Sequence, residues 1–349
     1  MCRYMDIKIN KKLSITDKKS PLIIAEISGN HCGKKSIFLK HIKYAAKCGA
    51  DLIKIQTYEP VDITLRNNNY KIKSGIWKSS TLWSIYQKAH TPFAWHADAF
   101  RLAKKIGATI FSTPFSKRAV DYLEKLKNPI YKISSFEITD LNLIKYIAAK
   151  RKPIILSTGN STIKEIKKAL KIINRYHNKV TILHCVSDYP TLESDAQINF
   201  IGQLKKIFYK NPIGLSDHTN DINSSLAATA LGATMIEKHF KISNRIKSPD
   251  SKFSILPSQL KMLKNMSVKI HETIGNNKPK KKVSSKALFF RRSIFTKRDL
   301  KKGTIINENN ISVLRPKIGI GAEEFFNVIG KKLKKDIKKN SPVFFTDLK

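Results

Sequence analysis

The sequence is poor in acidic residues, poor in cysteine, and without long apolar segments. Its four cysteines are scattered over 349 residues with no paired spacing, which excludes a disulfide framework and predicts reduced thiols. No apolar run reaches the roughly 18–20 residues that a membrane-spanning helix needs. Residues 1–12 are polar and basic and lack the apolar core of a secretory signal. These absences predict a cytoplasmic protein with no membrane partner.

The shortage of acidic residues leaves a formal net charge of +40, from 66 basic and 26 acidic side chains. A field of this strength attracts polyanions in general. A nucleic-acid-binding protein is the alternative from a different class, and it requires basic and aromatic residues clustered on one face. The lysines are instead spread along the whole chain, which favours a compositional bias. We therefore expect no specific nucleic-acid partner, although the field can help to draw in a small acidic substrate.

Eight short apolar runs, rich in β-branched residues, alternate with segments of helical periodicity. This alternation predicts βαβ units and a parallel sheet. Eight strands over about 220 residues predict a closed (β/α)8 TIM barrel near its usual size. An open doubly wound sheet is the alternative, but no run is followed by the glycine-rich turn that binds phosphate in such sheets. The runs are residues 21–30, 51–57, 109–115, 130–136, 153–159, 180–186, 212–218 and 235–240.

The barrel pattern ends near Gly275, and a polar, basic stretch follows it. The sequence therefore predicts a catalytic barrel domain at residues 1–275, a linker at 276–287 and a small domain at 288–349. A domain of about 60 residues has little stability of its own. We expect it to pack on a barrel, either its own or that of a partner chain.

The segment 59–92, between the second and third runs, is longer than a simple loop plus helix. It carries three large aromatic residues, Trp77, Trp83 and Tyr86. A loop that follows a barrel strand stands above the mouth of the barrel, where active sites are built. This segment is therefore expected to cover part of the active site.

Four charged residues lie inside runs that are otherwise apolar: Glu26, Lys54, Lys132 and Glu237. A buried charge is costly unless it is paired or coordinated, so four in one barrel are expected to share a site. Internal salt bridges that only fix the strand order are the alternative. Lysines and hydroxyl groups together suit a phosphate and an adjacent carboxylate. Other polar side chains at the strand ends are Gln56, Thr113, Ser135, Glu137, Ser157, Ser187, Tyr189 and Ser216.

Two histidines, His218 and His239, end the seventh and eighth runs. These strands are neighbours in a closed barrel, so both imidazoles can reach one divalent metal ion, for which histidine is the commonest ligand. Two protein ligands leave positions open for substrate and water. A hydrogen-bonded structural role is the alternative for a single histidine. We expect the ion to polarise an aldehyde that a phosphorylated enol attacks. Water addition and loss of phosphate then require carboxylates such as Glu26, Glu137 or Asp250.

Ten short motifs stand out along the chain. Eight lie in the barrel part: AEISGNH (25–31), ADLIKIQTY (50–58), FSTPF (111–115), YKISSFE (131–137), STGN (157–160), GLSDHT (214–219), IEKHF (236–240) and SPDSKFS (248–254). Two lie in the small domain: LFFRRSIF (288–295) and ISVLRP (311–316). Together, and in this order, the barrel motifs resemble those of the sialic acid synthase family. The last two resemble that family's small antifreeze-like, or SAF, domain.

The resemblance implies a transferase that condenses phosphoenolpyruvate with a hexose-derived aldehyde to a nine-carbon 2-keto sugar acid. It implies Mn²⁺, or else Mg²⁺ or Co²⁺, bound by His218 and His239. Arg315 is expected to reach across a domain-swapped homodimer to the acyl-amino group of the acceptor sugar. The resemblance further implies catalytic roles for Glu26, Lys132, Glu137, Glu237 and Asp250, and substrate binding by Lys54, Gln56, Thr113, Ser135, Ser157, Ser187, Tyr189, Ser216 and Arg315.

Within this family, residues 75–96 and Ser187 resemble the pseudaminic acid synthase branch; sialic acid synthases proper have asparagine at the position of Ser187. The implied acceptor is 2,4-diacetamido-2,4,6-trideoxy-L-altrose. N-acetylneuraminate and legionaminate synthases are the alternatives, and a condensing enzyme for a phosphorylated sugar is a more distant one that the SAF-like tail disfavours. Two positions depart from the family pattern. Cys32 replaces the usual asparagine of the Asn-His-x-Gly turn, and Asn160 stands where a hydrophobic residue is more common.

Overall fold

The computed structural model describes residues 6–67, 70–275 and 283–349, and it divides the chain into a unit at 1–275 and a unit at 276–349. Residues 276–282 of the expected linker lie outside the described ranges. In its remaining part, helix α11 (Ser285–Phe289) begins because the Ser284 hydroxyl accepts a hydrogen bond from the Ala287 N–H. Within the described ranges, no helix combines the length and apolar character that a bilayer span requires.

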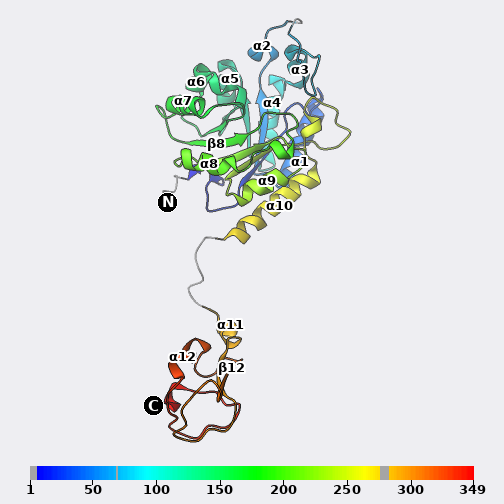
Figure 1. The fold of residues 1–349 in the computed structure, drawn as a ribbon. Coiled ribbons are helices and arrows are strands. Elements are labelled where there is room, and N and C mark those ends of the chain that lie inside the picture. The colour runs from blue at the N-terminus through cyan, green and yellow to red at the C-terminus, as the bar shows by residue number, and fades with distance from the viewer. Residues whose placement is uncertain (1–5, 68–69, 276–282) are drawn as a thin grey trace. The chain divides into compact units, whose positions relative to one another are not determined.

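In the first unit, eight parallel strands close into a barrel in the order β10-β3-β4-β5-β6-β7-β8-β9 (Figure 1). Each predicted run forms one strand, so the predicted TIM barrel is confirmed. Strands that are buried on both faces need continuous apolar sequence, which explains why the runs were recognisable. The strands are β3 (Leu22–Glu26), β4 (Leu52–Thr57), β5 (Ile110–Pro114), β6 (Tyr131–Ile133), β7 (Ile154–Ser157), β8 (Val180–Cys185), β9 (Ile213–Asp217) and β10 (Met235–His239).

Amphipathic helices surround the strands (Figure 1). Helix α7 (Ile163–Ile173) shows the local logic: Thr162 and Glu165 form a capping box at its start, and Ile166 and Ile173 are buried toward the barrel. The other helices that follow barrel strands are α1 (Lys35–Lys47), α4 (Phe93–Lys105), α5 (Lys117–Lys125), α6 (Leu141–Ala148), α8 (Phe200–Ile207), α9 (Asn223–Ala230) and α10 (Pro257–Ile274). Short 3-10 turns lie in the connections at η1 (Ser135–Thr139), η2 (Glu193–Asp195) and η3 (Ser251–Phe253).

A small hairpin precedes the barrel, with β1 (Ile7–Lys8) antiparallel to β2 (Ser14–Ile15). Its isoleucines pack in one apolar cluster with strand residues that include Leu52 and Met235. Both of these residues begin their strands, so the hairpin packs on the amino end of the barrel. The opposite, carboxyl end is left for the polar residues.

The segment between β4 and α4 contains α2 (Pro60–Ile63) and α3 (Leu82–Ala89), which lie together in Figure 1. Thr81 caps α3 by accepting a hydrogen bond from the Ser84 N–H at 3.1 Å. Before α3, the indole N–H of Trp77 donates to the carbonyl of Pro249, in the loop after β10, at 3.2 Å. The segment is therefore fastened to the loop that follows β10.

The second unit has its own apolar core, which includes Ile294, Ile306, Ile311 and Val328. Its two strands, β11 (Ser293–Thr296) and β12 (Ile311–Leu314), pair antiparallel. The remaining elements are short: η4 (Ala322–Glu324), α12 (Phe325–Val328) and η5 (Phe345–Asp347). The cysteines of the described ranges, Cys32, Cys48 and Cys185, are free thiols.

Candidate functional site

A cavity of about 480 Å³ opens at the carboxyl end of the barrel. All but three of the residues that the sequence assigned to the site line it. The three exceptions are Glu26, which is fully buried behind Lys54, Thr113, which is buried on β5, and Arg315, which belongs to the second unit. The predicted residues on the wall are Lys54, Gln56, Lys132, Ser135, Glu137, Ser157, Ser187, Tyr189, Ser216, His218, Glu237, His239 and Asp250.

The four charged strand residues form one continuous chain of ion pairs. Lys54 Nζ lies 2.9 Å from Glu26 Oε2 and 2.9 Å from Glu237 Oε1. Lys132 Nζ donates to Glu237 Oε2 at 2.7 Å. The register of the barrel strands explains the first of these ion pairs, because Glu26 lies directly beside Lys54 on the neighbouring strand. The prediction that the four charges lie together therefore agrees with the geometry.

The pKa values within this chain are unequal. Burial opposes ionisation of Glu237, but Lys132 and Lys54 outweigh it and hold the pKa of this carboxyl far below its ordinary range. Burial raises the pKa of Glu26 to about 7, against the opposing influence of Lys54. Burial lowers the pKa of Lys132, although Glu237 offsets part of this effect. Two lysines thus share one fully ionised carboxylate, and this arrangement suits an anionic ligand.

Hydroxyl groups from β5, β7 and the turn after β6 surround the two lysines. The Ser157 and Thr113 hydroxyls are buried without a hydrogen-bond partner among the described residues. The N–H of Gly159 donates to Ser135 Oγ at 3.0 Å, and a Cβ on Gly159 would clash with the hydroxyls of Ser187 and Ser135. Buried polar groups normally find partners. Oxygen atoms of a bound phosphate or carboxylate can supply them.

The two histidines face each other, with ring centroids 5.4 Å apart. His218 Nδ1 lies 2.8 Å from the Val186 carbonyl, a contact that fixes the ring and leaves Nε2 for another partner. His239 Nδ1 is buried without a hydrogen-bond partner among the described residues. Burial, and then the neighbouring His218, lower the pKa of His239, which keeps its imidazole neutral and able to ligate. The pair therefore fits a divalent metal ion.

The remaining ligands of such an ion cannot all be protein side chains. In the described ranges, no group of three or more histidine, cysteine, aspartate or glutamate residues is arranged to hold a metal. Two imidazoles are too few to complete a coordination shell, so substrate and water must fill the other positions. Open positions of this kind characterise catalytic metal sites, whereas structural sites are closed.

Three further carboxyl or amide groups complete the polar wall. Asp250 accepts from the Ser28 hydroxyl at 2.5 Å and from the Gly29 N–H at 2.8 Å, while burial raises its pKa. Gln56 Nε2 donates to Glu26 Oε1 at 3.3 Å and thereby links this cluster to the ion-pair chain. Burial raises the pKa of Glu137 to about 7, so this group can hold or release a proton near neutral pH.

Some residues of the cavity were not identified from the sequence. Cys185 lies 3.8 Å from His218 Nδ1, a partner 33 residues away along the chain. An apolar wall forms the upper part of the cavity, and its members Tyr58, Ile72, Trp77, Leu82, Ile85, Tyr86, Phe115 and Phe136 come from three separate loops. The aromatic content of the segment 59–92 was the only signal of this wall in the sequence.

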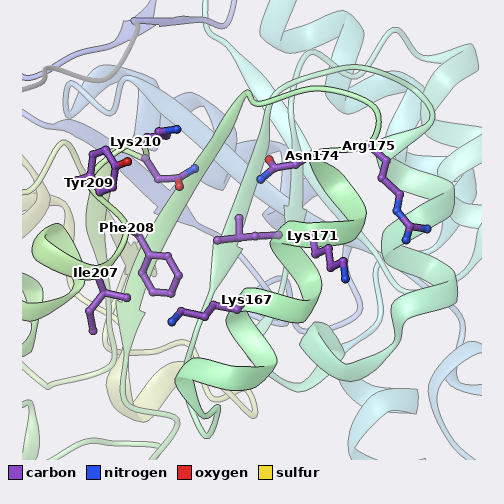
Figure 2. A pocket seen from close by; sticks show the side chains of 10 residues that line it. Lys167, Lys171, Asn174, Arg175, Ile207, Phe208, Tyr209 and Lys210 are labelled. Carbon is purple, nitrogen blue, oxygen red and sulfur yellow. The ribbon is translucent and has the colours of Figure 1, made fainter.

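A second hollow, of about 550 Å³, lies outside the barrel between α7 and the residues after α8 (Figure 2). Lys167 and Phe208 face each other across it, and Lys171, Arg175 and Lys210 lie around them. Its lining contains no carboxylate and no histidine. It therefore offers neither a carboxylate nor an imidazole, and we place the catalytic chemistry in the barrel mouth.

The barrel, the lysine and hydroxyl cluster and the histidine pair define an α/β-barrel enzyme whose cavity is suited to a small anion. Residues 41–279 match the NeuB family, and residues 291–349 match the SAF domain. The chain belongs to the NeuB family and is an enzyme of the sugar acid synthase type.

Named relatives are similar over almost their whole length. The pseudaminic acid synthase of Helicobacter pylori is 39% identical over 333 residues, which cover 94% of this chain and 98% of the relative. The N,N'-diacetyllegionaminic acid synthase of Campylobacter jejuni is 36% identical over 92% of this chain and 98% of the relative. The crystal structure of the N-acetylneuraminic acid synthetase of Leptospira borgpetersenii in complex with citrate aligns with a TM-score of 0.74 and 28% identity, over 81% of this chain and 94% of that one.

Proposed function

We propose that this protein is a pseudaminic acid synthase. It condenses phosphoenolpyruvate with 2,4-diacetamido-2,4,6-trideoxy-L-altrose and releases phosphate. The observation that carries the proposal is that Lys54, Lys132, His218 and His239 line one cavity. This cavity offers positive charge for a phosphorylated acid and imidazoles for a metal. The similarity to a pseudaminic acid synthase and to an N,N'-diacetyllegionaminic acid synthase supports the same type of reaction.

Phosphoenolpyruvate binds at the floor of the cavity. Its phosphate and carboxylate take hydrogen bonds from Lys54 and Lys132 and from the Ser157 hydroxyl, which has no partner among the described residues. Ser135, Ser187 and Ser216 contribute further hydroxyls: Ser216 Oγ donates to Glu237 Oε1 at 3.2 Å, and the other two lie against Gly159. A fixed, buried set of donors holds the enol carbon in one orientation toward the acceptor.

His218 and His239 hold a divalent ion, Mn²⁺ in our proposal, with Mg²⁺ or Co²⁺ as substitutes. When bound, the ion acts as a Lewis acid that polarises the aldehyde oxygen of the acceptor. The Val186 carbonyl orients the His218 imidazole, and burial lowers the pKa of His239 and keeps that imidazole neutral, as ligation requires.

The chain's own carboxyl groups carry the proton transfers. The new carbon–carbon bond leaves an electron-poor carbon at C2 of the former enol, to which water adds before phosphate departs. Glu137 lines the cavity and burial raises its pKa to about 7, so it can take the proton from this water or supply one to the new hydroxyl. Burial also raises the pKa of Glu26 to about 7, and this carboxyl acts from behind Lys54, with which it is paired. Asp250, held by Ser28 and Gly29, borders the same cavity and orients the acceptor.

The apolar wall favours a diacetamido acceptor with a methyl group over N-acetylmannosamine. The proposed acceptor carries a methyl group at C6 and two acetyl groups, whereas N-acetylmannosamine carries a hydroxymethyl group and one acetyl group. Trp77, Ile72 and Phe115 offer apolar contacts and no charge. An apolar wall binds methyl groups more favourably than hydroxyls, which lose their hydration there.

Arg315 and a homodimer complete the proposal. Arg315 carries a guanidinium suited to an acyl carbonyl, and it lies next to β12 of the SAF domain. We propose that the SAF domain of one chain serves the barrel of its partner in a swapped dimer. Arg315→Ala should then raise the KM for the acceptor more than the KM for phosphoenolpyruvate. Mixing Arg315→Ala chains with inactive His239→Ala chains should restore part of the activity, and a lack of complementation would contradict the swap.

The test of the main proposal is identification of the product by mass spectrometry. The purified protein is incubated with phosphoenolpyruvate, Mn²⁺ and one of three acceptors: the altrose derivative, N-acetylmannosamine, or the diacetamido acceptor of legionaminate synthases. We expect a nine-carbon acid from the altrose derivative, with phosphate release in equal amount. Robust turnover of either other acceptor without turnover of the altrose derivative would assign the chain to another branch.

A further inference from the structure

Trp77 is the centre of an aromatic cluster that spans the barrel mouth. We use "mouth segment" for residues 70–89, the part of the connection between β4 and α4 that runs to the end of α3. In this segment only Trp77 has its ring against residues of the loops after β8 and β10, among the ring contacts of the described residues. Its centroid lies 5.5 Å from that of Tyr189 and 6.4 Å from that of Phe253. The hydrogen bond to Pro249 fixes the indole in this position.

The two partners of Trp77 are also the neighbours of the two histidines. The Tyr189 ring lies 4.3 Å from the His218 ring, and the Phe253 ring lies 4.8 Å from the His239 ring. Tyr189 and Phe253 touch each other as well, with centroids 5.1 Å apart. One indole on the mouth segment thus contacts both side chains that pack on the histidine rings.

We propose that Trp77 is a positioning residue that acts on the metal affinity of His218 and His239 through Tyr189 and Phe253. The inference rests on the proposed metal site. With the mouth segment in place, the indole packs the two rings against the imidazoles and holds both imidazoles in one orientation. Without the indole, Tyr189 and Phe253 gain rotational freedom, and the histidine pair loses the order that two-point ligation needs.

The size of the effect follows from the type of contact. Residues that orient metal ligands by hydrogen bonds commonly change metal affinity by about 10- to 100-fold. Aromatic packing contacts are weaker than these hydrogen bonds. We therefore expect removal of the indole to weaken metal binding about 3- to 10-fold. The coupling must also act in reverse, because linkage between two binding or ordering events is reciprocal.

The chain offers a matched control in the same segment. Trp83 lies on α3, is half-buried like Trp77, and stacks under the guanidinium of Arg66. It does not line the cavity. Trp83→Ala therefore removes an indole of the same size from the same segment without touching the cluster. Trp77→Phe keeps a ring in the cluster and loses only the hydrogen bond to Pro249.

The experiment measures Mn²⁺ dissociation constants by electron paramagnetic resonance, without substrates, for the wild-type chain and for Trp77→Ala, Trp77→Phe, Trp83→Ala and His239→Ala. We expect about 3- to 10-fold weaker binding in Trp77→Ala, wild-type binding in Trp83→Ala, and recovery of most of the affinity in Trp77→Phe. In the reverse direction, saturating Mn²⁺ should slow amide hydrogen exchange in residues 76–79 of the wild-type chain.

Each other outcome overturns a defined part of the reasoning. Equal Mn²⁺ affinity in Trp77→Ala and wild type, or equal weakening in Trp77→Ala and Trp83→Ala, would refute the positioning role. So would unchanged amide exchange on addition of Mn²⁺. If His239→Ala bound Mn²⁺ as tightly as wild type, the proposed metal site itself would be wrong, whatever Trp77 does.

Discussion

The ion-pair chain should be most sensitive to substitution of Glu237, because this carboxylate pairs with both Lys54 and Lys132. Glu237→Gln keeps the volume and removes the charge, so two buried ammonium groups are left with Glu26 alone. Breaking a buried pair by removal of one partner costs about 3–5 kcal/mol. The glutamine oxygen still accepts one hydrogen bond, so we expect a loss near the lower end, about 3 kcal/mol of unfolding free energy.

Urea unfolding followed by tryptophan fluorescence measures this loss in the barrel specifically, because all three tryptophans, Trp77, Trp83 and Trp95, lie in the first unit. The double variant Glu237→Gln/Lys132→Met should be more stable than Glu237→Gln alone, since it removes one of the surplus charges.

The pH dependence has a defined sign. Burial lowers the pKa of Lys132, and loss of Glu237 lowers it further, so the unfolded chain binds more protons than the folded one above the folded pKa of this lysine. The stability deficit of Glu237→Gln should therefore shrink as the pH rises from 7 toward 10. A loss below about 1 kcal/mol, or a deficit independent of pH, would refute the view that Glu237 neutralises both lysines.

Three further predictions concern the same cavity. His239→Ala should abolish metal-dependent turnover and leave the circular dichroism spectrum unchanged; activity that survives chelation and metal replacement would contradict the metal assignment. Glu137→Gln should stabilise the barrel by about 1–3 kcal/mol at pH 8 but little at pH 4. The reason is that the raised pKa of Glu137 costs the wild-type barrel stability as the pH rises from the ordinary pKa of a glutamate to about 7. Urea unfolding at both pH values tests this prediction. Gly159→Ala should raise the KM for phosphoenolpyruvate at least tenfold in steady-state assays, because its Cβ would displace the hydroxyls of Ser187 and Ser135.

The barrel was predictable because its physical signature is local. Each strand is buried on both faces, so it appears as one apolar run, and a charge such as Lys132 inside such a run is conspicuous. Parallel strands present their carboxyl ends on one rim, which allowed His218 and His239 to be placed together from their strand positions alone. The sequence therefore identified those site residues that lie on strands or at their ends.

The parts of the site that could not be predicted depend on contacts between loops that are far apart in the sequence. Trp77 meets Tyr189 and Pro249 across more than a hundred residues, and no periodicity encodes such a meeting. Cys185 and His218 lie 33 residues apart in the sequence, but the barrel register places Ser216 beside Cys185 and brings His218 within 3.8 Å. The β1–β2 hairpin was missed for another reason: two-residue strands are too short to show alternation.

The two departures from the family motifs have a conformational interpretation. Cys32 and Asn160 both have left-handed backbones, with φ of 52° and 55°. Asparagine is among the few residues that tolerate this region, whereas a bulky hydrophobic residue does so at a cost. Asn160 therefore suits its position better than the more common hydrophobic residue. At position 32, an asparagine would tolerate the left-handed backbone better than the cysteine does.

The ion-pair chain also links substrate binding to protonation. Lys54 lowers the pKa of Glu26, which burial raises to about 7, so an anion that takes over Lys54 removes a lowering influence and adds a negative charge nearby. Both changes raise the pKa of Glu26, and phosphoenolpyruvate should therefore bind with proton uptake at pH 7.5. Calorimetric titration in buffers of different ionisation enthalpy measures this uptake, which should disappear in Glu26→Gln. If that variant took up as many protons as wild type, Glu26 would not be the coupled group. If the variant took up no protons, Glu26 would be the carboxyl that is protonated when phosphoenolpyruvate binds. Glu26 would then hold a proton that is available for the later steps of the reaction.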